Sequence, residues 1–295
     1  VCSSDLNWFV MKRGTALGIA ATGISVSGVV MPAISALIIA EFGWRNGFIT
    51  YGLITWLVVV PVVLKLVISR PEDRGLLPDG ATEKTSLAPP RPKLKTREFL
   101  ANRVFWFLTI TIGLLFCIQS ATLIHMVPRL TDQGLSLVSA SYIASATAFF
   151  GIIGKLVYGI LVDRWDVRHA LWLGTAFQVA GQLLMFAEDR PMTFLLGACL
   201  FGFGMGGVVP MQGAVVGAAF GRDSFGKVLG AMRPPMSVIH LLGVPFAGWV
   251  FDVNGTYQPA FLAFLGLYLI TAIMVSGVRV ETRSKQRLRA DEAVS

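Results

Sequence analysis

The chain alternates between long apolar segments and shorter polar connections. Eight segments each hold about 20 mainly apolar residues, the length that a helix needs to cross the hydrocarbon core of a bilayer. They lie at roughly residues 15–40, 47–67, 104–127, 137–162, 169–187, 191–214, 226–250 and 259–278. This pattern predicts an all-α polytopic membrane protein with eight transmembrane helices.

The longest polar interruption, at residues 68–103, follows the second apolar segment and contains five prolines and eight lysines or arginines. Such a composition is typical of a solvated linker, and we expect a short helix near its end, starting at about Thr96. The linker separates a two-helix part, residues 7–67, from a six-helix part, residues 104–278. Residues 279–295 form a polar tail.

The composition excludes several classes of protein. With 54% hydrophobic and 14% charged residues, the chain is far more apolar than a soluble domain, in which about 25% of residues are charged. The net charge of +8 does not indicate a nucleic-acid partner, because the basic residues flank the apolar segments and form no continuous basic face. No nucleophile–base set, metal-ligand cluster or phosphate loop is recognisable, so we expect neither an enzyme nor a cofactor or metal.

Most of the positive charge lies on one side of the predicted membrane. Twenty of the 25 lysines and arginines flank the segments on that side, and only Arg45, Arg129 and Arg190 fall on the other. Because cytoplasmic connections carry the excess of Lys and Arg, we expect the linker and the C-terminal tail to lie in the cytoplasm. The expected location is the inner membrane of a bacterium.

A weak repeat relates the two ends of the chain. At a constant offset of 212 residues, Gly14, Leu17, Gly18, Ser25, Val26 and Gly43 match Gly226, Leu229, Gly230, Ser237, Val238 and Gly255. Chance matching between glycine-rich helices is one explanation, and a parallel repeat between two six-helix halves of a transporter is the other. The second explanation makes residues 7–67 the fifth and sixth of twelve helices, with four helices missing before them.

Two cations, Lys155 and Arg233, lie inside apolar segments. With a rise of ~1.5 Å per residue, Lys155 is about 12 Å from its helix end at Asp163, and Arg233 is about 10 Å from its helix start near Gly226. A lone cation at such a depth costs at least ~2.5–3.5 kcal/mol, and no segment carries a central Asp or Glu. The pair therefore predicts an anion-binding site. Alternatively, either cation pairs with an acid on the missing helices, or Lys155 extends to the cytoplasmic interface.

Three further polar side chains are candidates for contacting the same anion. Tyr158 is one turn from Lys155, Gln119 lies in the middle of its segment, and His240 is seven residues after Arg233 on the same helix face. For His240 we favour a different role, that of a hydrogen-bonded packing residue. The glycine-rich run at residues 202–207 lies inside an apolar segment, so it indicates close helix packing and not a nucleotide loop.

Five stretches of sequence carry a family resemblance. They are WFVMKRGTALGIAATG (8–23), GWRNGF (43–48), PEDRGLLPDG (71–80), GILVDRWDVR (159–168) and GVPFAGWVFDVNGTYQPAF (243–261). They resemble stretches of the major facilitator superfamily, in particular its monocarboxylate transporters and its oxalate/formate antiporter-like group. The resemblance implies a major facilitator fold that lacks the first four helices. It also implies that Lys155 and Arg233 lie on helices eight and eleven.

The stretch 159–168 is similar to the Gly-x-x-x-Asp-Arg loop motif of the superfamily, which implies a cytoplasmic gate formed by Gly159, Asp163, Arg164 and Arg168. Gly159 lets a neighbouring helix approach closely. For Asp163 two kinds of partner are open: the N-terminal amides of a neighbouring helix, or Arg164 or Arg168. The resembling antiporters bind substrate carboxylates through one basic residue on each of helices eight and eleven. Here the Lys and Arg stand in the opposite order, which leaves the substrate open.

Residues 1–6, VCSSDL, look like the translation of a sequencing-library adapter, and we treat them as foreign to the protein. For the rest we predict a secondary active transporter that moves a small mono- or dicarboxylate across the bilayer by alternating access. Symport with a proton and exchange for another anion both fit. Efflux of another amphipathic molecule and ligand sensing without transport are the alternatives.

Overall fold

The computed structural model describes residues 8–9, 12–68, 71–77, 94–186, 190–221 and 224–277. The expected foreign residues 1–6, the C-terminal tail and half of the linker lie outside this part. The described chain is built from helices, as the apolar segments predicted.

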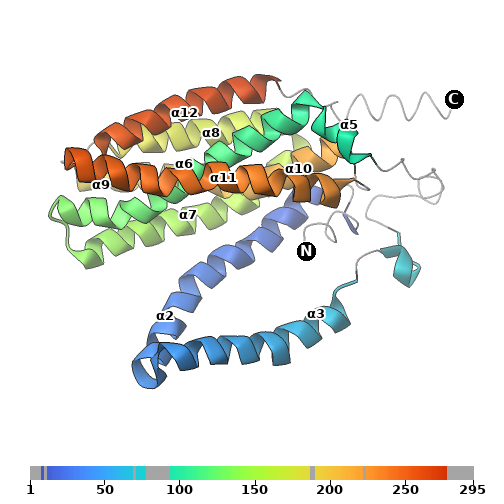
Figure 1. Cartoon of the computed structure of the whole chain (residues 1–295), viewed down its shortest axis with the longest axis horizontal. Helices are drawn as coiled ribbons and strands as arrows, with labels where there is room; N and C mark the ends of the chain where they lie inside the picture. Colours follow the sequence, from blue (N-terminus) through green and yellow to red (C-terminus); the bar gives the residue numbers. More distant parts are fainter. Residues whose placement is uncertain are drawn as a thin grey trace.

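The larger part of the molecule is a bundle of long helices that lie side by side (Figure 1). Its elements are α6 (Arg103–Asp132), α7 (Leu137–Arg164), α8 (Val167–Leu184), α9 (Pro191–Gly206), α10 (Val208–Phe220), α11 (Phe225–Asn254) and α12 (Gln258–Gly277). The helices α9 and α10 continue one another and form a single apolar span, Pro191–Phe220. The bundle thus contains the six helices that were predicted for residues 104–278.

The first part of the chain forms a helical hairpin that projects from this bundle (Figure 1). It consists of α2 (Arg13–Ile54), a π-helical turn η1 (Thr55–Val59) and α3 (Val60–Leu66). Within α2 the helix changes direction at Gly43, whose φ of 76° is left-handed and suits a residue without a Cβ. The indole of Trp8 donates to the Ile68 carbonyl oxygen at 2.8 Å, which joins the two arms at their open end.

Six of the eight predicted spans are confirmed among the described residues as helices long and apolar enough to cross a membrane. The other two are helical as well. The first, predicted at 15–40, falls within α2, where Gly14–Ser27 is a shorter apolar helix. The other is α8, whose 18 residues include Arg168, His169 and two glutamines. The count of eight transmembrane helices therefore stays a prediction.

The ends of the helices follow local sequence signals. The side chain of Asn102 accepts from the Val104 amide at 2.9 Å at the start of α6, and Asp166 does the same for Arg168 at the start of α8. Gly255, with a φ of 68°, ends α11 in the left-handed conformation. The short helix expected at Thr96 is confirmed as α5 (Thr96–Leu100).

The repeat reappears in the geometry. The helix α2 begins at residue 13 and α11 at residue 225, which is the same offset of 212, and the matched glycines Gly43 and Gly255 both have positive φ. The helices that follow them also end at nearly this offset, α3 at Leu66 and α12 at Gly277. This agreement favours a true structural repeat over chance matching.

Glycines bring α9 close to both of its neighbours, as the run at 202–207 predicted. A Cβ added at Gly204 would lie 2.6 Å from the Gly174 carbonyl of α8, and one at Gly202 would collide with the Thr147 carbonyl of α7. The backbones are thus in contact where any side chain would separate them. As a result α9 is recessed between α7 and α8.

Candidate functional site

The hairpin joins the bundle at a crossing of α2 and α7 that is made by glycine. A Cβ added at Gly159 would lie 2.7 Å from the Gly14 carbonyl oxygen, and one at Gly18 would lie 2.6 Å from the Lys155 carbonyl oxygen. Gly159 therefore allows the close approach that the motif predicted. A Cβ added at Gly23, further along α2, would have nothing within 4 Å. The backbone contact through glycine therefore lies in the first turns of α2.

Asp163 holds the start of α2 against the end of α7. Its Oδ1 accepts from the Gly14 amide at 2.7 Å, and its Oδ2 accepts from the amide and the hydroxyl of Thr15 at 2.8 and 2.7 Å. A carboxylate in this place satisfies free amides of the helix N-terminus and complements its positive dipole. Of the two kinds of partner left open for Asp163, the structure thus shows the neighbouring helix amides.

The two arginines of the motif are placed differently from Asp163. The Arg168 guanidinium pairs with Asp166 at 3.1 Å, while Arg164 is exposed. Burial raises the pKa of Asp166, but hydrogen bonds from the Arg168 side chain and backbone, and the charges of Arg168 and His169, outweigh that effect and hold the pKa below its usual value. The gate motif therefore contains two separate carboxylate contacts, one between helices and one within the loop.

Lys155 lies one helical turn before Gly159, at the same crossing. Its side chain is only 8% exposed, and its ammonium contacts the hydroxyl of Ser25 on α2. Its backbone is covered from two sides, by Gly18 of α2 and by Gly206 of α9. A Cβ added at Gly206 would lie 2.8 Å from the backbone nitrogen of Lys155. The position is thus buried by the backbones of two other helices.

Arg233 occupies a different setting on α11. It is exposed, next to the buried Met232. The helix continues through Pro234 and Pro235, which lie inside α11 without ending it. Within the described part of the chain, neither Lys155 nor Arg233 lies within ion-pair distance of a carboxylate. No contact joins the two cations to each other.

Two polar side chains near these cations were not singled out by sequence. Ser25 is the partner of Lys155, and its match with Ser237 in the repeat was the one signal that pointed to it. Gln212 of α10 is 5% exposed and contacts the Met236 sulfur at 3.6 Å, one turn from Arg233. A buried amide one turn along α11 from the position of Arg233 is a further group able to orient an anion.

Tyr158 and Gln119 point into the interior of the bundle. Tyr158 is fully buried against Phe203, with 5.3 Å between ring centroids, and its hydroxyl has no hydrogen-bond partner in the described structure. The Gln119 amide donates to Gln178 at 3.0 Å, and the Tyr268 hydroxyl donates to the same oxygen at 3.3 Å. The structure does not bring either residue into contact with Lys155 or Arg233.

His240 is exposed on α11, with its ring 6.0 Å from that of Phe116. The hydrogen-bonded packing role that we favoured is not found, because no hydrogen bond of His240 occurs among the described residues. Its exposure resembles that of Arg233, seven residues before it.

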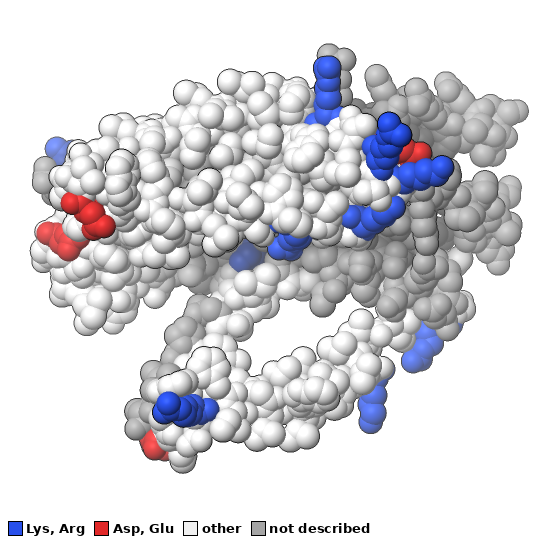
Figure 2. Space-filling model, in the orientation of Figure 1, with Lys and Arg blue, Asp and Glu red and all other residues white. Residues whose placement is uncertain are grey.

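The charges are unevenly distributed along the bundle. Figure 2 shows basic side chains gathered at the end where α5 lies and acidic side chains at the opposite end. Between the ends the visible face is almost uncharged (Figure 2). Among the described residues no group of three or more His, Cys, Asp or Glu side chains is placed to hold a metal ion.

Three features are more typical of membrane transport proteins than of other classes of protein: a bundle of apolar spanning helices, an internal repeat, and cations within the apolar spans. The family model described as the Major Facilitator Superfamily matches residues 6–159 and again residues 130–294. The chain therefore belongs to the Major Facilitator Superfamily.

Curated relatives agree with this assignment. Monocarboxylate transporter 12 of Rattus norvegicus is 24% identical over 308 residues, which cover 95% of this chain and 62% of the relative. Monocarboxylate transporter 13 of the same species is 24% identical over 275 residues, with 92% and 60% covered. An MFS-type transporter of Aspergillus fumigatus is 24% identical over 274 residues, with 90% and 62% covered. The chain thus spans about three fifths of the length of these relatives.

Proposed function

We propose that the full-length protein is a secondary active transporter that moves a small mono- or dicarboxylate across the membrane by alternating access. Lys155 and Arg233 bind the carboxylate, and Gln212 and His240 are the nearest candidates for additional contacts. The observation that carries the proposal is the buried ammonium of Lys155, which has a hydroxyl as its partner and no carboxylate in the described structure. The relatives named as monocarboxylate transporters support the substrate class.

The proposed mechanism uses the charge of Lys155. A buried cation without a counter-ion costs free energy in a low-dielectric site, and a bound carboxylate offsets this cost. The bound anion neutralises Lys155 and Arg233, so that the occupied carrier can change between its outward-open and inward-open states. Proton symport and anion exchange both remain compatible with this scheme.

The contact between α2 and α7 serves as the cytoplasmic gate in this proposal. Two observations support a closed gate: Asp163 caps α2, and the glycines of the two helices are in contact. Release of the substrate to the cytoplasm requires these hydrogen bonds to break. Under this proposal, access from the cytoplasm between α2 and α7 is blocked as long as these contacts hold.

The test is uptake of labelled oxalate, formate, lactate and pyruvate into proteoliposomes that contain the product of the longest reading frame including this chain. Lys155→Gln and Arg233→Gln are compared with Lys65→Gln, which removes an exposed cation at the end of α3. We expect uptake of at least one of these anions, and a loss of about tenfold or more in each site variant, since a charged hydrogen bond contributes ~1.5–3 kcal/mol. Lys65→Gln retains uptake.

The outcomes separate the parts of the proposal. Full uptake by both site variants would exclude the two-cation site and leave transport intact. Absence of uptake of every carboxylate by the wild-type protein would contradict the substrate class. Tight carboxylate binding without any flux would instead favour a sensor on the same fold.

A further inference from the structure

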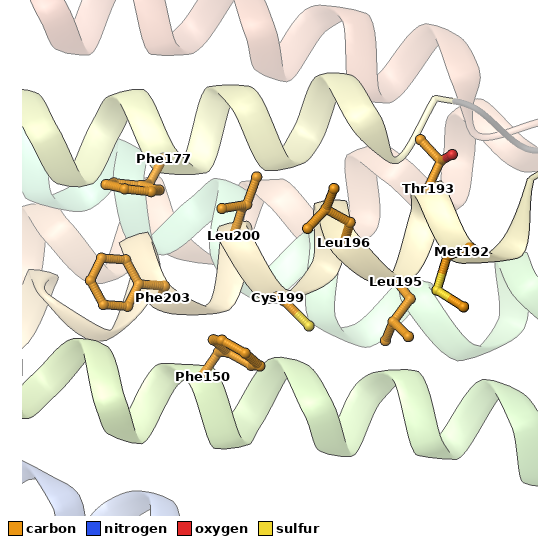
Figure 3. Close-up of a pocket in the computed structure, with 9 residues that line it drawn as sticks. All are labelled: Phe150, Phe177, Met192, Thr193, Leu195, Leu196, Cys199, Leu200 and Phe203. Carbon is orange, nitrogen blue, oxygen red and sulfur yellow. The ribbon is translucent and has the colours of Figure 1, made fainter.

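A groove of about 600 Å³ runs along the outer side of α9, between α7 and α8 (Figure 3). Leu196, Cys199 and Leu200 of α9 form its floor, and Phe150 of α7 and Phe177 of α8 stand on either side. None of these residues belongs to the proposed anion site. Apart from Thr193, the lining residues are apolar.

The groove exists because α9 is recessed. Backbone contacts through glycine draw α9 inward on the α7 side at Gly202 and on the α8 side at Gly181, where an added Cβ would lie 2.5 Å from the Gly197 carbonyl oxygen. The larger side chains of α7 and α8 then rise above the surface of α9. Since the backbones already touch, the helices cannot approach further to close the groove.

The groove has one open and one closed end. Met192, 76% exposed, and Thr193 lie at the open end, in the first turn of α9. Phe203 lies at the other end, where its ring packs against Phe177 at 5.0 Å and Tyr158 at 5.3 Å between centroids. The twelve residues from Met192 to Phe203 extend over about 16 Å of helix. That length is about half of a ~30 Å hydrocarbon core, or the depth of one leaflet.

The chemistry of the groove changes at its open end. The helix α7 and the continuous α9–α10 are apolar spans, so the groove faces hydrocarbon along most of its length. Arg190, an exposed cation, precedes Met192 by two residues. A ligand complementary to the groove is therefore a long apolar chain with a negative group at the end that reaches the membrane surface.

We propose that this groove binds one acyl chain of an anionic phospholipid from the leaflet nearest the start of α9, with the lipid phosphate beside Arg190. The glycine contacts of α9 keep the binding site open. This site is separate from the proposed carboxylate site and does not depend on it.

The experiment measures phospholipid bound to the purified full chain by native mass spectrometry, with phosphatidylglycerol or phosphatidylcholine added. Leu196→Trp and Cys199→Phe fill the floor of the groove, and Leu269→Trp places the same bulk on α12, where Leu269 is 69% exposed. Phosphatidylglycerol with a photoreactive acyl chain then identifies the contacted peptide in each protein.

We expect wild-type protein to retain phosphatidylglycerol in preference to phosphatidylcholine and to be crosslinked within residues 192–203. Both groove variants should bind at least about tenfold less, the loss that follows when a few methylene groups leave their contacts. Leu269→Trp should bind as wild type, and Arg190→Gln should lose the preference for phosphatidylglycerol.

Equal lipid binding by wild type and both groove variants would overturn the proposal, as would crosslinking spread evenly over all helices. Loss of a dimer in Leu196→Trp without loss of lipid would assign the groove to a second copy of the chain and would also overturn it. An unchanged lipid preference in Arg190→Gln would exclude the headgroup contact.

Discussion

The partner of Lys155 is a neutral hydroxyl, and this has a consequence for substrate affinity. In the structure the ammonium contacts Ser25 and no carboxylate of the described residues. A charged hydrogen bond contributes ~1.5–3 kcal/mol, and the carboxylate that we propose as substrate has to replace this contact. Ser25 therefore stabilises the empty carrier.

Replacing Ser25 by Ala should strengthen substrate binding. The variant leaves the ammonium without its hydroxyl partner, so the empty state loses stability relative to the occupied state. We expect KM for carboxylate uptake to fall several-fold, whereas Lys155→Gln raises it, and initial rates in proteoliposomes measure both. A higher KM in Ser25→Ala would instead mean that the hydroxyl contacts the substrate.

A second prediction about a single residue concerns Asp166, in the loop of the gate motif. The lowered pKa of Asp166 means that its bond to Arg168 contributes stability above the ordinary carboxyl pKa of about 3.9, and that this contribution disappears as the pH falls through the lowered value. We expect Asp166→Ala to unfold at a lower temperature than wild type at pH 7, because losing a helix cap lowers the free energy of unfolding by ~0.5–2 kcal/mol. The difference from wild type should shrink toward pH 3.

The control for Asp166 is Asp166→Ser, which keeps a capping oxygen without a titrating charge. Its stability relative to Asp166→Ala should not change between pH 7 and pH 3. Thermal unfolding followed by tryptophan fluorescence provides the measurement. A difference between wild type and Asp166→Ala that persists unchanged at pH 3 would contradict the role of the ion pair.

At the scale of elements, the crossing of α2 and α7 depends on the absence of side chains. A methyl group at Gly159 would lie 2.7 Å from the Gly14 carbonyl, a backbone atom that cannot rotate away. We expect Gly159→Ala to separate the helices at a cost of about 1–3 kcal/mol, as overpacking does, and to weaken the Asp163 cap. Lower thermal stability and uptake measure this effect.

Gly23→Ala is the matched control on α2, because a Cβ there meets nothing within 4 Å. The better helix propensity of Ala should leave stability unchanged or raise it by up to ~1 kcal/mol. Equal losses in Gly23→Ala and Gly159→Ala would show that the loss does not come from the α2–α7 contact.

The sequence was informative about elements and less so about the direction of side chains. Apolar length located the helices, because that signal is local. The motif around Asp163 left two kinds of partner open, and only the packing of α2 against α7 shows the helix amides. The sequence could not predict whether the side chains of Tyr158 and Gln119 point into the bundle or toward lipid. Lipid and protein interior are both apolar, so a spanning helix shows no polar face. Arg233 and His240, by contrast, share an exposed face at the spacing that the sequence indicated.

At the scale of the whole molecule, the hairpin and the bundle differ in how much of their surface is covered. The span Glu41–Leu66 is almost entirely exposed in the chain, whereas most of Arg103–Asp132 is buried in the bundle. Both are equally apolar, so composition alone could not predict which one packs. The repeat relates α2 and its following arm to α11 and α12, so a packed pair of helices and an exposed pair share one sequence pattern.

The orientation of the whole molecule is open to a direct test. Ser136, which caps the start of α7, and Trp165, which follows its end, lie at opposite ends of one apolar span. The excess of basic residues predicts that Trp165 is cytoplasmic and Ser136 is external. In intact cells, a membrane-impermeant maleimide should label Ser136→Cys and not Trp165→Cys, both in a background without the natural cysteines. After the cells are permeabilised, both sites should react. The reverse labelling pattern would invert the proposed gate, because the closed contact between α2 and α7 would then face the outside.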